Sequence, residues 1–219
     1  MNSKLEEKLQ VKFKNQELLQ QALTHSSYAN ENLVLDNERL EFLGDAIIGL
    51  LMGEHLFFTN KMSEGEMSKK RAELVCEEAL AFYGEQISLA DYLLLGKGVV
   101  QLGGKSNPAI IADAFEALFG AVYLEFGFQQ VKDLFLKLVV PYIEKVKIVD
   151  YKSTLQELVQ IERRNITYQV EKEEGPAHDK TFTVSVKMDN LTLGIGVAKT
   201  KKEAEQEAAK EALKKVAKE

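Results

Sequence analysis

Three carboxylates in the first quarter of the sequence have the spacing that a helix needs to present them together. Glu38, Glu41 and Asp45 stand at positions i, i+3 and i+7, and a helix turns by about 100° per residue, so the three side chains share one face. Like charges at this spacing repel by roughly a few tenths of a kcal/mol. A divalent cation would remove the repulsion, but acids at such spacing are also common on solvated helix faces.

A second acidic pair lies far along the chain in apolar surroundings. Asp113 and Glu116 are the only charged residues in the segment 106–124, and they stand three positions apart on a helix that is apolar nearly all round. Such a helix is buried, and buried carboxylates need a partner. An ion pair or a helix cap from elsewhere in the fold would serve. The alternative is that two helices bring Glu41 and Asp45 beside this pair, around metal.

Both stretches resemble the acidic motifs of the bacterial ribonuclease III family. Residues 37–45 read Asn-Glu-Arg-Leu-Glu-Phe-Leu-Gly-Asp, like the family signature, and residues 112–117 read Ala-Asp-Ala-Phe-Glu-Ala, like its second acidic motif. Residues 22–28 (Ala-Leu-Thr-His-Ser-Ser-Tyr) and 64–68 (Glu-Gly-Glu-Met-Ser) resemble the same family, in the same order. The sequence departs from the family at Ala109, where Ser is common; this change leaves the acids untouched.

The resemblance implies a metal-dependent endoribonuclease that cuts double-stranded RNA as a homodimer, through a helical domain, and leaves 5′-phosphate ends with short 3′ overhangs. The implied metal ligands are Glu41, Asp45, Asp113 and Glu116, with Asp45 and Glu116 catalytic. Glu38 and Glu64 would be auxiliary acids. Carboxylate oxygens suit Mg²⁺, for which Mn²⁺ can substitute. Two such ions would hold the attacking water and the leaving oxygen.

The histidines do not suggest another mechanism. The chain has three, and none lies near either acidic motif in the sequence, which disfavours acid–base catalysis by histidine. His25 ends a helical stretch, where we expect a packed, hydrogen-bonded group rather than a catalyst.

Residues 1–148 read as an all-helical domain. The expected helices lie at 3–10, from 15 to 25, at 37–58, 66–84, from 108 and from 127, with a loop at 29–36 and a glycine-rich loop at 96–107. Pro141 either kinks the last helix or starts a new one. The expected inner stripe of the helix at 37–58 is Leu40, Leu43, Ile47, Leu50 and Leu51.

The pattern changes in residues 149–219. Apolar residues alternate with polar ones at 167–170, 182–186 and 191–197, which predicts three strands, and helices are expected at 154–160 and 200–217. The second domain is therefore a small α+β unit with the order α-β-β-β-α.

This unit resembles the double-stranded RNA-binding domain. The resemblance lies in Leu155-Gln156-Glu157, in Gly175-Pro176-Ala177-His178 and in the segment 199–204, which contains three lysines. Lysines at a helix start attract phosphate, while the other two pieces would touch the minor grooves of an RNA duplex. The implied RNA-binding residues are Gln156, His178, Lys199, Lys201 and Lys202. For the lysine pair alone, a solvated helix end is the simpler interpretation.

Bulk properties restrict the remaining functions. The net charge of −6 argues weakly against nucleic acid, but the acids concentrate in the first domain, since residues 149–219 hold 13 acidic and 13 basic side chains. One cysteine, Cys76, excludes an internal disulfide. No secretory signal and no apolar run of about 20 residues are visible, so we expect a cytoplasmic protein without a membrane span.

Two functions without cleavage remain as alternatives. One is a double-stranded-RNA-binding or scaffold protein on the same frame, and the other is an RNA chaperone acting through the second domain. The presence of all four implied metal ligands favours the enzyme.

Overall fold

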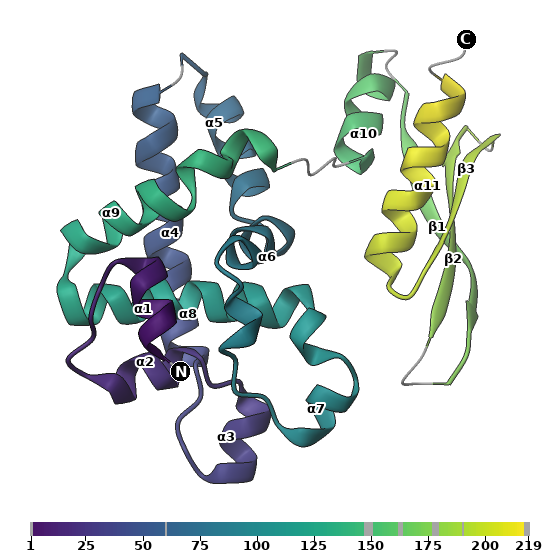
Figure 1. Ribbon diagram of the computed structural model, residues 1–219. Helices are drawn as coiled ribbons and strands as arrows, with labels where there is room; N and C mark the ends of the chain where they lie inside the picture. The colour runs from purple at the N-terminus through teal and green to yellow at the C-terminus, as the bar shows by residue number, and fades with distance from the viewer. Residues whose placement is uncertain are drawn as a thin grey trace. The chain divides into compact units, whose positions relative to one another are not determined.

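The computed structural model describes residues 2–59, 61–146, 151–161, 164–176, 180–189 and 191–216. The chain forms two compact units, Met1–Ile148 and Val149–Glu219. The first is helical and the second joins two helices to a three-stranded sheet, as the sequence predicts (Figure 1).

The first unit is built from helices of very different length. Its described α-helices are α1 (Asn2–Leu9), α2 (Gln16–Ala22), α3 (Ser26–Asn32), α4 (Glu38–Thr59), α5 (Glu64–Leu74), α6 (Glu77–Gln86), α7 (Lys97–Gln101), α8 (Pro108–Phe126) and α9 (Phe128–Leu138). The described part of this unit also contains the 3-10 turns η1 (Leu89–Asp91), η2 (Gly104–Ser106) and η3 (Val140–Lys145). Pro141 therefore starts a new turn rather than kinking α9.

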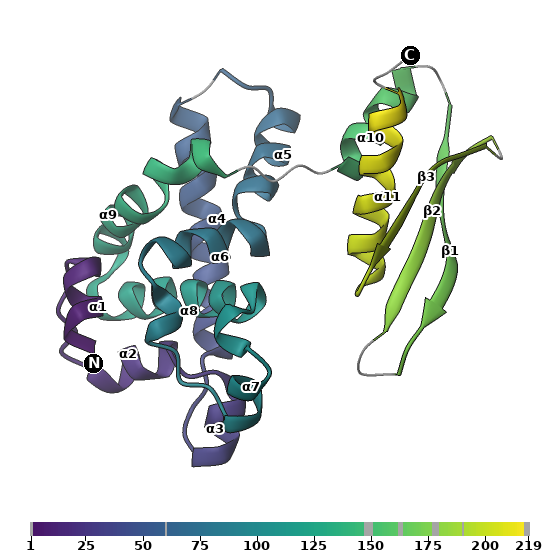
Figure 2. The same cartoon turned by 45° about the vertical axis from the view of Figure 1, so that its right-hand side comes forward.

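The two longest helices, α4 and α8, cross at the centre of this unit (Figures 1 and 2). Their backbones touch because both carry glycine at the crossing. A Cβ on Gly44 would lie 1.8 Å from the carbonyl oxygen of Glu116, and one on Gly120 would lie 2.4 Å from that of Leu40. Any side chain at either position would push the helices apart, so the pair of glycines sets their spacing.

Helix α8 is surrounded by the core. Its side chains Phe115 and Phe119 are fully buried, with ring centroids 5.0 Å apart, and Tyr83 of α6 lies 6.1 Å from Phe115. The helix begins as the sequence predicts, since Asn107 accepts the backbone N–H of Ala109 at 3.1 Å. Burial of most of its residues leaves α8 little freedom to move, which fixes the two acids that it carries.

Three local predictions were wrong. Residues 29–36 are not all loop, because α3 occupies Ser26–Asn32, capped by the side chain of His25. The glycine-rich segment contains the short α7 and η2. The helix expected at 66–84 is two helices, because the backbone is extended at Cys76 and the buried hydroxyl of Tyr83 donates to the carbonyl oxygen of Leu74 at the end of α5.

The inner stripe of α4 is also shorter than expected. Leu40, Ile47 and Leu51 are buried and Leu43 is half-buried, but Leu50 is 60% exposed. Phe42, Phe57 and Phe58 of the same helix are also exposed. Helix α4 therefore has an apolar surface that the described residues of the first unit leave exposed.

Among the described residues, only α4 is long and apolar enough to cross a membrane, with a mean hydropathy of 1.3. The sequence suggested no such stretch, because glycines and acids interrupt the apolar run. The central helices of soluble proteins pass the same test. Since α4 packs against α5, α8 and α9 and carries the acids Glu41, Asp45 and Glu54, its composition fits a core helix.

The second unit places two helices on one face of an antiparallel sheet (Figure 2). Its elements are α10 (Tyr151–Ile161), β1 (Ile166–Glu174), β2 (Thr181–Met188), β3 (Leu191–Ala198) and α11 (Lys201–Val216), with the strand order β1-β2-β3. Gly194 and Gly196 let α11 approach the backbone of β3, since a Cβ at either would lie within 2.2 Å of a carbonyl oxygen of α11.

A side chain of α11 bonds a backbone group of the edge strand β3. The N–H of Ile195 donates to the carboxylate of Glu211 at 2.6 Å, and the same carboxylate pairs with Lys215 at 2.8 Å. Helix α11 thus contributes a polar contact at this edge in addition to its apolar face.

We expect Gly44→Ala to destabilise the first unit by about 2 kcal/mol or more, because the methyl group has no space against the carbonyl oxygen of Glu116. The control is Gly49→Ala on the same helix, where a Cβ meets nothing within 4 Å; there a gain of about 0.5–1 kcal/mol is expected. Chemical denaturation of the two variants measures both effects. Equal stability of the two would contradict the proposed close contact.

Candidate metal centre and nucleic-acid interface

Three carboxylates from the two crossing helices meet beside the crossing point. Glu41 of α4 and Asp113 and Glu116 of α8 each offer an oxygen, and these oxygens all lie within 4.8 Å of one another. All three side chains are half-buried. Glu41 thus joins the predicted pair of Asp113 and Glu116, because Gly44 allows α4 to rest on the backbone of Glu116 itself.

Burial makes the charged form of each carboxylate unfavourable. Desolvation, followed by the charges of Asp45, Glu41 and Asp113, raises the pKa of Glu116 to about 8. Burial is also the main cause that raises the pKa of Glu41, with the charge of Asp113 next. The pKa of Asp113 is raised by burial first. Without a cation, Glu116 therefore keeps its proton at neutral pH.

Two further predicted acids lie at the rim of the cluster. Asp45 is exposed and is not among the three that share the short distances, although its charge raises the pKa of both Glu116 and Glu41. Glu38 is exposed too, and its charge raises the pKa of Glu41 and of Asp113. Both therefore act on the cluster electrostatically from its solvent side.

Glu64 lies elsewhere on the first unit. It is in the first turn of α5, accepts a hydrogen bond from the hydroxyl of Ser68 at 2.8 Å, and lines a hollow with Gly53 and Phe57. Position 53 is three turns beyond Glu41 on α4, about 18 Å along the helix axis. Within one chain, Glu64 is thus separate from the other acids.

The structure adds two residues that sequence reasoning did not place here. Among charged neighbours, Glu77 at the start of α6 contributes most to raising the pKa of Asp113, while the charge of His25 lowers it. No histidine lies near either acidic motif along the sequence, but the fold brings His25 within electrostatic range of Asp113. No sequence signal marks Glu77, because only the packing of α6 on α8 brings it close.

The cluster fits a hard divalent cation. Its donors are carboxylate oxygens from two rigid helices, their mutual repulsion is uncompensated by lysine or arginine in any described ion pair, and a cation would relieve both the repulsion and the desolvation. Of the two alternatives that the sequence left open, the described ion pairs include none at these acids, and the cluster could hold a metal ion.

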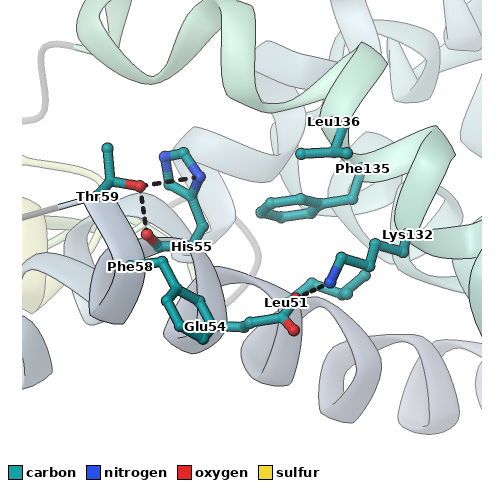
Figure 3. A pocket seen from close by; sticks show the side chains of 8 residues that line it. All are labelled: Leu51, Glu54, His55, Phe58, Thr59, Lys132, Phe135 and Leu136. Carbon is teal, nitrogen blue, oxygen red and sulfur yellow. Dashed lines mark hydrogen bonds and ion pairs between the residues drawn. The ribbon is translucent and has the colours of Figure 1, made fainter.

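A different hollow, between α4 and α9, has the wrong chemistry for this purpose. It encloses about 170 Å³ and is lined mainly by apolar side chains, among them Leu51, Phe58 and Phe135 (Figure 3). The charged groups there are already paired, since Lys132 and Glu54 lie 2.7 Å apart. The lining holds one carboxylate, that of Glu54, and so offers no cluster of acids for a metal ion.

The second unit presents lysines at the start of α11. Lys199, Lys201 and Lys202 are exposed, and the ammonium of Lys201 lies 5.4 Å from the ring centroid of Phe182. Thr200 caps the helix: its hydroxyl accepts the N–H of Glu203, and the carboxylate of Glu203 accepts the N–H of Thr200, each at 3.2 Å. The cap fixes the direction of the helix end and so the position of the lysines.

The other RNA-binding residues implied by the resemblance are only partly described. Gln156 is half-buried on α10 and lines an open hollow with Lys152, Ser153, Glu157 and Tyr168. His178 lies outside the described residues. Of the implied RNA-binding residues, Lys199, Lys201 and Lys202 therefore form the exposed basic surface that the structure describes, at the start of α11.

Comparison with known families agrees with both units. Residues 15–143 match a model described as ribonuclease-III-like, and residues 151–216 match the double-stranded RNA binding motif. Together the two matches cover most of the chain. The chain belongs to the ribonuclease III family. It is an endoribonuclease with a domain for double-stranded RNA, which disfavours the alternatives without cleavage.

Individual relatives support membership of the ribonuclease III family. Ribonuclease 3 of Aster yellows witches'-broom phytoplasma is 51% identical over 94% of this chain and 87% of that protein. Ribonuclease 3 of Bacillus cereus strain G9842 is 46% identical over 96% of this chain and 89% of that protein. The solved nuclease domain of ribonuclease III from Campylobacter jejuni covers 67% of this chain and 98% of its own, with 43% identity and a TM-score of 0.61.

Without divalent ions, the stability of the first unit should fall as the pH rises from about 4.5 to about 8, because Glu116 ionises freely in the unfolded chain but is protonated in the fold up to a pKa of about 8. Mg²⁺ should raise the melting temperature most above pH 8. Glu116→Gln should flatten both trends, whereas Glu85→Gln, at an exposed position of α6, should change neither. An equal response to Mg²⁺ in all three proteins would place the ion elsewhere.

Lys201→Ala with Lys202→Ala should weaken duplex RNA binding and reduce the slope of log affinity against log salt by nearly one per lost phosphate contact, about two in all. Lys214→Ala with Lys215→Ala removes the same charge from the last turn of α11 and serves as the control. Binding titrations at several salt concentrations decide the matter. If the two double variants lose the same slope, α11 does not bind phosphate through its first turn.

Proposed function

We propose that the chain hydrolyses phosphodiester bonds of double-stranded RNA at the carboxylate cluster with Mg²⁺, for which Mn²⁺ can substitute. The products would carry 5′-phosphate and 3′-hydroxyl ends with short 3′ overhangs. The observation that supports this most is the meeting of Glu41, Asp113 and Glu116 within 4.8 Å in a chain that also carries a double-stranded RNA binding motif.

The proposed ligands are these three carboxylates and Asp45. Asp45 is included because its charge already acts on Glu116 and Glu41, although its oxygens are outside the closest group. Glu38, exposed beside them, and Glu64, on α5, would have auxiliary roles. When bound, two ions would supply Lewis-acid stabilisation of the charge on the scissile phosphate and its leaving oxygen.

The residues themselves prepare the site in two ways. The carboxylates stand on helices whose backbones are in contact, so little movement is needed to reach the reacting arrangement. Glu116 must give up its proton when positive charge enters, since its pKa is about 8 in the metal-free fold. Cleavage should therefore depend on pH and on the metal concentration together.

We also propose that the chain acts as a homodimer through the first unit. Phe42, Leu50, Phe57 and Phe58 of α4 are between 60% and 80% exposed, and such an apolar helix surface is typical of one covered by a partner. For the nuclease domain from C. jejuni, flexibility has been described in a region involved in dimer formation.

The proposed cellular role is processing of ribosomal RNA precursors and messenger RNA in the cytoplasm. Family membership supports this role, and the single cysteine is consistent with a reducing compartment.

Glu116→Gln should abolish cleavage of a long RNA duplex in Mg²⁺ while duplex binding stays within about twofold of the unchanged chain. The substitution removes a metal ligand but leaves the lysines of the second unit intact. Cleavage and binding are measured on the same duplex, with Glu85→Gln as the control. Near-normal turnover by Glu116→Gln would remove this residue from the metal centre and overturn the proposed mechanism.

A further inference from the structure

Glu173 is an acidic residue beside the basic surface of the second unit. It lies near the end of β1, and the end of β1 is at the same end of the unit as the starts of β2 and α11 (Figures 1 and 2). In the sheet Glu173 is paired with Phe182 of β2, and Phe182 is paired with Ala198 of β3. Directly opposite residues project from the same face of a sheet, so the carboxylate of Glu173 stands next to the ring of Phe182.

Two lysines contact this pair of neighbours. The ammonium of Lys180 lies 2.5 Å from a carboxylate oxygen of Glu173, and the two side chains are 41% and 39% exposed. The ammonium of Lys201, in the first turn of α11, lies 5.4 Å from the ring centroid of Phe182. The hydrogen bond from Lys180 is the largest cause that lowers the pKa of Glu173, and the charges of Lys180 and Lys201 act in the same direction. The carboxylate is therefore a counter-ion within the basic surface.

The next residue of β1 provides a comparison. Glu174 is also paired with a lysine, since Lys172 lies 2.7 Å from its carboxylate. Successive side chains of a strand point to opposite faces, so this second pair projects away from the face that carries Glu173 and Phe182. Glu173 and Glu174 thus have the same charge and the same kind of partner, but only Glu173 shares a face with the ring under Lys201.

We propose that Glu173 is a built-in competitor of RNA phosphate: its carboxylate holds the ammonium of Lys180, and a phosphate oxygen of duplex RNA takes its place on binding. The inference rests on the proposed binding of duplex RNA at the lysines that begin α11. Carboxylate and phosphate oxygens accept the same charge-assisted hydrogen bonds from an ammonium group. Glu173 weakens RNA binding in two ways, because Lys180 must leave it and because its own charge repels the phosphate backbone.

The competing role of this ion pair is structural. In that role Lys180 and Glu173 only tie the start of β2 to the end of β1. The two roles predict opposite effects on the affinity for RNA. Loss of a structural contact lowers the melting temperature and weakens binding or leaves it unchanged, whereas loss of a competitor makes binding tighter.

The experiment measures the binding of the full-length chain to one RNA duplex at several salt concentrations, without divalent ions so that the duplex is not cut. At low salt Glu173→Gln should bind about two- to fivefold tighter than the unchanged chain, the range expected for the release of one exposed ion pair. The slope of log affinity against log salt should become steeper by nearly one, because Lys180 gains a phosphate contact. Glu174→Gln removes the same charge from the other face of the strand and should leave the slope unchanged.

A substitution of Lys180 completes a double-mutant cycle. Lys180→Ala alone should change the affinity by less than about twofold, because Glu173 already neutralises this lysine. In the Glu173→Gln background the same substitution should remove the steeper slope. Melting temperatures of all the variants are measured alongside, so that a loss of folded protein is not mistaken for weaker binding.

The outcomes separate this inference from the proposal on which it rests. Unchanged or weaker binding by Glu173→Gln, an equal gain from Glu174→Gln, or a steeper slope that persists without Lys180 would each overturn the role as competitor. If Lys201→Ala with Lys202→Ala loses no slope, the phosphate-binding surface is overturned and this inference with it. If that double variant loses slope but Glu173→Gln gains none, only this inference is overturned.

Discussion

The contact between the backbones of α4 and α8 determines the rest of the first unit. Two glycines, Gly44 and Gly120, leave no side chain between the helices, so the carbonyl oxygen of Glu116 occupies the place that a methyl group would take. At this spacing Glu41 of α4 lies close to Asp113 and Glu116 of α8. The packing of the two helices therefore determines where these carboxylates lie. The arrangement makes their charged forms unfavourable.

That cost is visible in the protonation of the cluster. Burial and mutual repulsion raise the pKa of Glu116 to about 8, and those of Glu41 and Asp113 shift in the same direction. A group of like charges in a half-buried place destabilises the fold that holds it, a common property of functional sites. Apolar burial in the surrounding core, where Phe115 and Phe119 are fully buried, offsets this loss in the free energy of unfolding.

The sequence was sufficient for the fold class, because helical periodicity and strand alternation follow from residue type. For the acids it left alternatives open, and of the four that the family resemblance implied as ligands the structure brings Glu41, Asp113 and Glu116 closest together. The sequence was insufficient where a tertiary contact decides. The break at Cys76 depends on a hydrogen bond from Tyr83 to Leu74, and Glu77 and His25 come close to Asp113 only through packing. The exposure of Leu50 could not be anticipated either, since apolar periodicity does not say which part of a stripe its own chain covers.

The hydrogen bond from the N–H of Ile195 to the carboxylate of Glu211 affects how the edge strand β3 can pair with another polypeptide. An open edge strand is a template on which another polypeptide can add a strand, and repeated addition leads to fibrils. A side chain that occupies a ladder position interrupts the row of free backbone groups, so this contact hinders the addition of a further strand at β3.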